Sequence, residues 1–231
     1  ALSITVAAAA QLALTTAPTA STVSDVNFAA QPVITIQDAS GNARSADTLV
    51  ITVALTTGTG ALSGTNVATA SAGVATFAGL SLNLVGADKV LTFTSSGLSS
   101  VVSSVLTITV AAAAQLSLTT APTASTVSAE AFSAQITIQD ASGNTRSADS
   151  LDVTVALTTG TGTLSGTAVA TASNGLPSYT SDAADEESGV ELVTLPIPGL
   201  PTVGTPVLPI PSESAASLTV SPAPASTHVA R

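Results

Sequence analysis

The sequence predicts an all-β fold with two tandem β-sandwich domains, on the strength of composition, alternation and a long internal repeat. Of the 231 residues 45% are apolar, mostly Ala, Val, Leu and Ile, whereas 8% are charged. β-branched residues favour pleated, half-buried surfaces. Exposed helix faces need charged residues that this chain lacks. Short apolar runs that alternate with Ser and Thr are separated by turn residues, as in a sandwich.

The internal repeat has a period of roughly 100 residues, which is the size of one sandwich domain. Gln11–Ser24 returns as Gln115–Ser128 with one difference, at an offset of 104 residues. Pro32 and Val33 have no counterpart in the second copy. Beyond them, Ile34–Gly73 matches the segment 102 residues later at 33 of 40 positions.

Within the first copy, seven strand-like runs fit an immunoglobulin-like sandwich. The predicted strands are Gln11–Thr16, Val33–Gln37, Leu49–Thr56, Asn66–Ala70, Ala75–Leu82, Val90–Thr94 and Val105–Val110. Alternation predicts inward-facing side chains at Leu49, Ile51, Val53, Leu55, Leu106, Ile108 and Val110. We expect an aliphatic core whose large members are Phe28, Phe77 and Phe93.

Four phrases of the sequence resemble bacterial immunoglobulin-like repeats of the invasin type. They are Ala10–Thr16, Val33–Asn42, Thr57–Thr65 and Gly73–Leu80. Such repeats occur in large surface adhesins and extracellular filaments. The resemblance covers about Ala10 to Gly175 and implies a sandwich fold and an extracellular or cell-surface setting. It says little about function, because such domains serve as spacers and in some proteins as binding tips.

The charge balance limits the partners that the sequence predicts. Four Lys and Arg residues stand against 14 Asp and Glu residues, for a net charge of −10. No basic stripe is available to neutralise phosphates or anionic lipids. We therefore expect neither nucleic-acid binding nor membrane insertion. The chain has no Cys, which excludes disulfides. It also has no Met, which suggests a mature form after signal-peptide removal, or a fragment.

The repeat divides the chain into four segments. Residues 1–9 form an N-terminal strand, 10–110 a first immunoglobulin-like domain, and 111–175 the recognisable part of a second. Residues 176–231 form a divergent acidic tail that holds nine of the 12 Pro residues and either completes the second domain or extends beyond it.

The N-terminal strand predicts a mode of assembly. Leu2–Val6 matches Leu106–Val110, the closing strand of the first domain, at the same offset of 104. The second domain loses the repeat pattern after Gly175 and lacks a recognisable closing strand. This mismatch favours head-to-tail self-association by donor-strand exchange. The polymerisation strand would insert Leu2, Ile4 and Val6 into a neighbouring copy.

The mismatch between the two ends of the chain has two simpler interpretations. In one, the chain is a piece of a longer array, and Leu2–Val6 simply ends the preceding repeat. In the other, the tail closes its own domain, since Ser217–Val220 resembles the closing strand. That segment ends 45 residues after Gly175, compared with 37 residues from Gly73 to Val110.

We expect a structural subunit of an extracellular filament. A stalk segment of a surface adhesin is the alternative, and a carbohydrate- or protein-binding module around Tyr179 is a second one. No catalytic residue, cofactor or small-molecule substrate is predicted. The only His is His228, three residues from the C-terminus, and general-base chemistry needs a positioned partner.

Calcium is the one candidate metal. Asp38, Asn42, Asp140 and Asn144 offer oxygen ligands in two copies of Asp-Ala-Ser-Gly-Asn. The same residue types form turns between strands, and a turn is the preferred interpretation. Lys89, the single lysine, is a candidate for an isopeptide cross-link to Asn, as occurs in some bacterial surface proteins.

Overall fold

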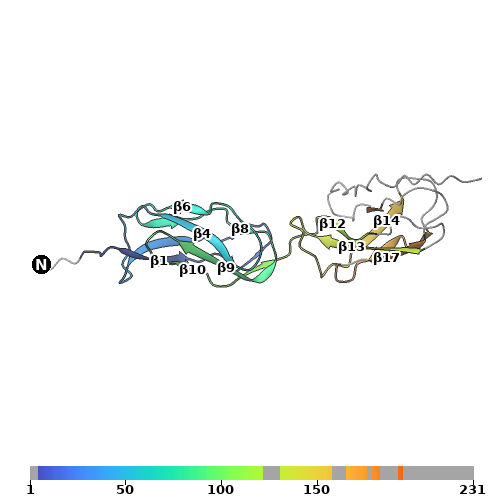
Figure 1. The fold of residues 1–231 in the computed structure, drawn as a ribbon, viewed down its shortest axis with the longest axis horizontal. Coiled ribbons are helices and arrows are strands. Elements are labelled where there is room, and N and C mark those ends of the chain that lie inside the picture. Colours follow the sequence, from blue (N-terminus) through green and yellow to red (C-terminus); the bar gives the residue numbers. More distant parts are fainter. Residues whose placement is uncertain (1–4, 122–130, 158–164, 176–177, 183–191, 195–231) are drawn as a thin grey trace, which may run out of the picture.

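The computed structural model describes residues 5–121, 131–157, 165–175, 178–182 and 192–194. Every element in this part of the chain is a β-strand, which confirms the all-β prediction. Figure 1 shows two bodies joined end to end, the first built from β1 to β11 and the second from β12 to β18. Within the same residues, no helix is long and apolar enough to cross a membrane.

The first domain is an immunoglobulin-like sandwich of two largely antiparallel sheets. One sheet has the order β1-β3-β7, and the other has the order β2-β11-β9-β4-β6 with β10 beside β9. β5 and β8 form a separate short pair. The strands are β1 (Ala9–Thr16), β2 (Ser21–Val23), β3 (Val33–Asp38), β4 (Val50–Thr57), β5 (Leu62–Ser63), β6 (Val67–Thr69), β7 (Val74–Thr76), β8 (Ser81–Leu82), β9 (Gly86–Thr94), β10 (Val101–Val102) and β11 (Leu106–Thr109).

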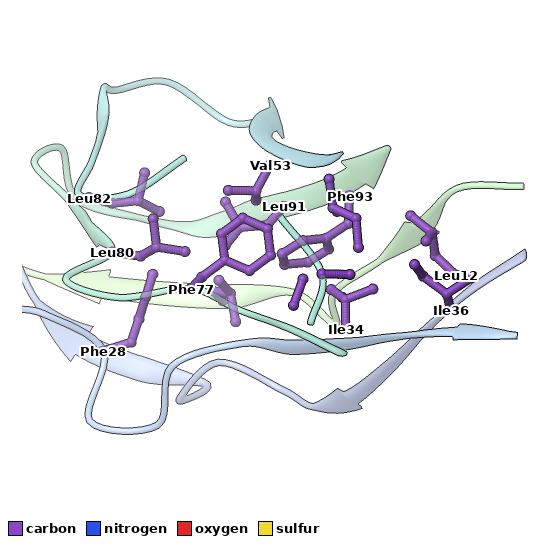
Figure 2. Close-up of a cluster of buried hydrophobic side chains, with 14 of the residues drawn as sticks. Leu12, Phe28, Ile34, Ile36, Val53, Phe77, Leu80, Leu82, Leu91 and Phe93 are labelled. Carbon is purple, nitrogen blue, oxygen red and sulfur yellow. The ribbon is translucent and has the colours of Figure 1, made fainter. Parts of the chain in front are cut away.

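The core of the first domain lies between these sheets. Phe28, Phe77 and Phe93 are each at most 2% exposed, as the sequence predicts. Phe77 and Phe93 lie at the centre of the cluster (Figure 2), with ring centroids 5.4 Å apart and ring planes inclined by 59°. Tilted aromatic pairs at this separation attract one another beyond their area of contact. The aliphatic side chains around them include Leu12, Ile34, Ile36, Val53, Leu80, Leu82 and Leu91.

The predicted alternation holds inside the strands and fails at their ends. Its confirmed buried positions are Ile51, Val53, Leu106 and Ile108. The inward orientation of Leu49 is wrong, because this residue precedes the start of β4 and is 36% exposed. Val110 follows the last residue of β11 and is only half-buried. Leu55 is half-buried too, but it packs against the core, so its predicted inward orientation is confirmed.

The observed strands of the first domain are also more divided than the predicted ones. The expected strand Ala75–Leu82 is split into β7 and β8, with Gly79 between them at a φ of +66°. A left-handed residue of this kind breaks a strand and favours glycine. The sequence did not predict β2, β5 and β10, which have two or three residues each and are too short to show an alternation.

The second domain has a four-stranded sheet of order β12-β13-β17-β15 and a three-stranded sheet of order β16-β14-β18. The buried side chains between them are Ile136, Ile138, Val153, Val155 and Ala172. The strands are β12 (Gln115–Thr120), β13 (Ala131–Gln139), β14 (Asp152–Leu157), β15 (Ser165–Gly166), β16 (Val169–Thr171), β17 (Ser178–Asp182) and β18 (Leu192–Thr194).

The divergent region supplies β17 to this domain and keeps the register of the first domain. Ser178 lies opposite Gln135 in the pairing of β17 with β13. In the first domain, Thr76 and Val33, each 102 residues earlier in the chain, are opposite one another between β7 and β3. The backbone ladder therefore continues past Gly175, although the sequence repeat does not.

The divergent region also supplies β18, which lies beside β14 as β9 lies beside β4. Leu192 is opposite Leu157, and Leu91 is opposite Leu55 in the first domain. β17 and β18 therefore both belong to the second domain, as the alternative in which the tail closes its own domain requires. Its proposed last strand, Ser217–Val220, lies outside the described residues.

Pro32 accounts for a difference in length between β3 and β13. A proline has no N–H group and interrupts the hydrogen-bond ladder of a sheet. β3 begins at Val33, directly after it. The second copy has no counterpart of Pro32, and β13 begins at Ala131 and runs for nine residues. Its first half pairs with β17.

Replacing Phe77 with Ala should lower the free energy of unfolding of the first domain by about 3–5 kcal/mol, because it removes a buried ring and leaves a cavity. Denaturant unfolding followed by circular dichroism measures this change. Val50→Ala is the matched control, because Val50 is 52% exposed and should shift the transition by no more than about 0.5 kcal/mol. Equal effects of the two substitutions would contradict the assigned core.

Candidate functional site at the domain junction

Both domains contain the same five-residue turn. It is Asp38–Asn42 in the first domain, beginning at the last residue of β3, and Asp140–Asn144 in the second, directly after β13. In each, the Asp N–H donates to the Asn carbonyl at 3.0 Å, and the Gly N–H donates to the Asp carbonyl at 3.1 Å. Gly41 and Gly143 have φ values of +86° and +83°. Glycine adopts this left-handed conformation without steric cost, so the repeated sequence builds the same local structure twice.

The carboxylate of Asp38 caps the first turn. Its Oδ1 accepts hydrogen bonds from the backbone N–H groups of Ser40 and Asn42, both at 2.9 Å. The side-chain amide of Asn42 donates to Oδ2 at 2.9 Å. These bonds, with the Asn42 side chain contributing most, lower the pKa of Asp38 from 3.8 to about 2, because they stabilise the ionised form.

The carboxylate of Asp140 caps the second turn in the same way. It accepts from the backbone of Ser142 at 3.0 Å and from the backbone and side chain of Asn144, both at 2.9 Å. Burial alone would raise the pKa of Asp140, but the hydrogen bonds outweigh it and the pKa lies below its usual value. Asp140 therefore remains an anion although it is fully buried.

The same carboxylates hold the segment by which the chain enters each domain. In the first domain, the N–H of Ala7 donates to Oδ2 of Asp38 at 3.2 Å. The carbonyl of Ala7 accepts from Nη1 of Arg44 at 2.5 Å. In the second domain the corresponding residues are Ala111, Asp140 and Arg146, and both contacts recur. Each entering segment is thus fixed from both sides.

Arg44 is itself held in place by its neighbours. It forms a two-pronged ion pair with Asp47, with nitrogen–oxygen distances of 2.9 and 3.1 Å. Gly73 packs against its backbone, and a Cβ on Gly73 would overlap the Arg44 carbonyl oxygen. Any larger residue would displace the arginine. Arg146, Asp149 and Gly175 repeat this arrangement in the second domain.

The opposite end of the first domain presents four residues that we call the junction pole: Ser24, Asp25, Asn83 and Val85. The first two follow β2, and the last two lie between β8 and β9. The Ser24 N–H donates to the carbonyl of Thr109, the last residue of β11, at 2.9 Å. The Ser24 hydroxyl donates to the Asn83 carbonyl at 2.6 Å. The junction pole therefore surrounds the point where the chain leaves the first domain.

Asn144 of the second domain docks onto this pole. Its Nδ2 lies 3.0 Å from the Ser24 hydroxyl and 2.8 Å from the Asn83 carbonyl, to both of which it donates. Its Oδ1 accepts from the N–H of Val85 at 3.1 Å. Both ends of one amide are thus bonded across the junction, and such a fully paired buried polar group fixes the geometry around it.

Exposure distinguishes the two turns, although their sequences and local structures agree. Asn144 is 6% exposed at the junction, whereas Asn42 is exposed. Ser142 is half-buried and donates to the carboxylate of Asp25, whereas Ser40 is exposed. The turn of the second domain is covered by the junction pole, and the turn of the first domain faces outward.

The four calcium candidates come together in pairs, one pair in each turn. The side-chain amide nitrogen of each Asn, rather than its oxygen, faces the neighbouring carboxylate, at 2.9 Å in both turns. Neither these turns nor any other part of the described residues contains a group of three or more His, Asp and Glu side chains that could hold a metal ion. The four residues build the turn that the sequence favours.

The predicted polymerisation strand falls mostly outside the described residues, since Leu2 and Ile4 belong to residues 1–4. Val6 is described. It is 46% exposed and precedes β1. His228 also lies outside the described residues. Tyr179 lies in β17 and is paired through its backbone with Ala134.

Lys89 is buried within the first domain, with an exposed fraction of 1%. Its Nζ donates to the Thr59 carbonyl at 2.8 Å and lies 3.3 Å from the carboxylate of Asp88. A Cβ on Gly86 would lie 2.7 Å from Nζ. The described contacts of this ammonium group are thus a hydrogen bond and an ion pair, and no Asn side chain is among them.

The sequence did not predict Ser24, Asn83 and Val85 as functional residues, nor the role of Asn144 at the junction. The pole residues come from two loops far apart in the chain, and no local pattern connects them. One signal in the sequence was the repetition of the entering segment. Ala7 stands 31 residues before the capping Asp38, and Ala111 stands 29 residues before the capping Asp140.

Comparisons with known proteins give no family assignment. No family model matches the chain, and no curated protein matches it. Among solved structures, the D0-D1 domain of Intimin is 17% identical at a TM-score of 0.32, covering 73% of this chain and 82% of its own. FdeC, an Escherichia coli adhesin, is 16% identical at a TM-score of 0.32. The match covers 87% of this chain and 63% of the FdeC chain. Bacteroides uniformis beta-glucuronidase 3 is 13% identical at a TM-score of 0.24 and is covered over 20% of its length.

Acid should destabilise the protein through the capping carboxylates. The pKa of Asp38 is about 2 in the folded state and 3.8 ordinarily, so the unfolded chain binds the proton more tightly. The stabilising contribution of Asp38 is therefore complete above about pH 5 and is lost as the pH falls towards 2. Melting temperatures measured between pH 7 and pH 2 should drop over this window, and Asp38→Asn should reduce the drop. An unchanged pH profile in Asp38→Asn would contradict the assignment.

Proposed function

We propose that this chain is a rigid structural segment of an extracellular, cell-surface fibre in which immunoglobulin-like domains stack end to end. The observation that carries the proposal is the buried side chain of Asn144, whose amide is bonded at both ends to the junction pole. Domains of one chain move relative to each other unless their interface holds them. Here a specific polar contact opposes that motion, as a spacer that sets reach requires.

The linker between the domains supports the same function. Residues 110–114 connect β11 to β12 and consist of one Val and four Ala. Flexible linkers are rich in Gly and Ser, and this one contains neither. Ala111 is bonded to Asp140, and the Ala114 N–H donates to the Gln139 carbonyl at 2.8 Å. The linker is therefore short and is fixed to the second domain.

Head-to-tail polymerisation by donor-strand exchange is the second candidate, and the position of β11 favours it. β11 lies between β2 and β9 and pairs with both, so a closing strand gains backbone hydrogen bonds on two sides. Leu2–Val6 repeats this strand in sequence. A filament of such copies would be a fibre of the same kind.

Replacing Asn144 with Ala should make the junction flexible, because it removes the hydrogen bonds from this side chain to Ser24, Asn83 and Val85, each worth about 0.5–1.5 kcal/mol. Small-angle scattering and electron microscopy of the purified chain should show straight particles for the original protein and a wide range of bends for the variant.

Asn42→Ala is the matched control. It removes the same contacts within the turn, but from a turn that faces outward, and it should leave the particles straight. Ser24→Ala removes a contact on the first-domain side of the junction and should also give bent particles. Straight particles in both Asn144→Ala and Ser24→Ala would contradict the rigid-spacer function.

Deleting residues 1–6 distinguishes filament from spacer. If donor-strand exchange builds a filament, the deleted chain should remain monomeric under conditions in which the full chain polymerises, because the strand that fills the neighbour is missing. Sedimentation velocity and electron microscopy measure this. Polymers of normal length after the deletion would exclude strand exchange, and isolated two-domain rods from the full chain would favour the spacer.

A further inference from the structure

The exposed turn of the first domain repeats a surface whose partner is visible in the same chain. In the second domain, Asp140 and Arg146 fix the entering segment and Asn144 projects onto the junction pole. In the first domain, Asp38 and Arg44 fix the entering segment with the same bonds. The first domain therefore carries every element of the docking surface except the partner.

We infer that the outward face formed by Ala7, Asp38, Ser40, Asn42 and Arg44 is a docking surface for the junction pole of another domain of this kind. This inference rests on the proposed function and specifies the partner. The partner offers a serine hydroxyl, a backbone carbonyl and a backbone N–H in the arrangement that Ser24, Asn83 and Val85 have here.

The state of the turn before docking supports this assignment. The side-chain amide of Asn42 is already held by Asp38, at 3.2 Å from Oδ1 and 2.9 Å from Oδ2. The corresponding distances in the docked turn are 3.1 and 2.9 Å, from Asn144 to Asp140. The turn thus has the same internal geometry with and without a partner, so docking costs little reorganisation.

The entering segment indicates which domain would dock. In the second domain the chain reaches Ala111 directly from β11, the strand that closes the docked first domain. In the first domain the chain reaches Ala7 from Leu2–Val6, which matches that strand in sequence. The partner is therefore a domain closed by Leu2–Val6, whether that domain precedes in the same polypeptide or belongs to another copy.

An extended chain tests the inference. Residues 7–104 are added in front of residue 1, so that Leu2–Val6 closes the added domain and its junction pole meets the first turn. The side-chain amide hydrogens of Asn42, followed by NMR, should exchange about fivefold more slowly than in the original chain, the factor that one net hydrogen bond contributes. Ser24→Ala in the added domain alone should abolish this protection.

A second extended chain removes the dependence on Leu2–Val6. Residues 7–110 are added directly in front of Ala7, so that the added domain has its own closing strand. The inference is overturned if the Asn42 amide stays unprotected in the extended chain that folds while the Asn144 amide is still protected. The proposed rigid junction would then remain intact. Loss of protection at Asn144 as well would instead count against the proposed function.

Sedimentation velocity of the original chain identifies the source of the partner. Concentration-dependent oligomers that Asn42→Ala returns to monomers would show that another copy supplies the pole. It would come from that copy's second domain, because Asn144 already occupies the pole of the first domain. A monomeric original chain, together with protected Asn42 in the extended chains, would show that a preceding domain supplies it. Oligomers that persist in Asn42→Ala, without protection in the extended chains, would overturn the inference.

Discussion

The carboxylate of Asp140 accepts hydrogen bonds from three parts of the chain at once. It binds the backbone of its own turn, the side chain of Asn144 and the N–H of Ala111 in the linker. The turn, the group that crosses the junction and the segment that joins the domains are therefore fixed relative to one another by a single buried anion. An unpaired buried charge would be costly, and the N–H donors around this one make burial tolerable. Without the carboxylate, the amide of Asn144 would lose the bonds that aim it at the junction pole.

The chemistry across the junction is mostly neutral. Asn144 meets a hydroxyl, a carbonyl and an N–H group, and one charged residue, Asp25, accepts from Ser142. Interactions between exposed charges weaken as ionic strength rises, but hydrogen bonds between neutral groups do not depend on it in that way. A junction of this composition suits the low charge content of the whole chain, where 8% of residues are charged. For the proposed fibre, stiffness would then be largely independent of the salt around it.

Strand alternation and the repeat were enough to predict the fold class, the long strands and the three core phenylalanines, because these depend on local periodicity and apolar burial. Strand ends were less predictable: Leu49 has the right residue type but lies one position before β4. The calcium candidates lie in two capped turns, because an oxygen-rich composition is common to cation sites and to such turns. The junction pole was beyond the reach of the sequence, since Ser24 and Asn83 become neighbours only when β2 and β8 reach the same end of the sandwich.

The second domain shows which constraints survive divergence. After Gly175 the side chains no longer follow the repeat, yet β17 keeps the register of β7 and β18 takes the place beside β14 that β9 has beside β4. Backbone pairing requires N–H and carbonyl groups in step, which almost any sequence supplies, whereas a turn that must cap a carboxylate and reach a partner needs particular residues. The match between the repeats is close over the turn, Arg44 and Gly73, which hold the entering segment in the same way in both domains. A fibre of stacked domains depends on its junctions for direction. The two repeats share the docking turn and Ser24, which recurs as Ser128, whereas Asp25, Asn83 and Val85 of the junction pole are not repeated.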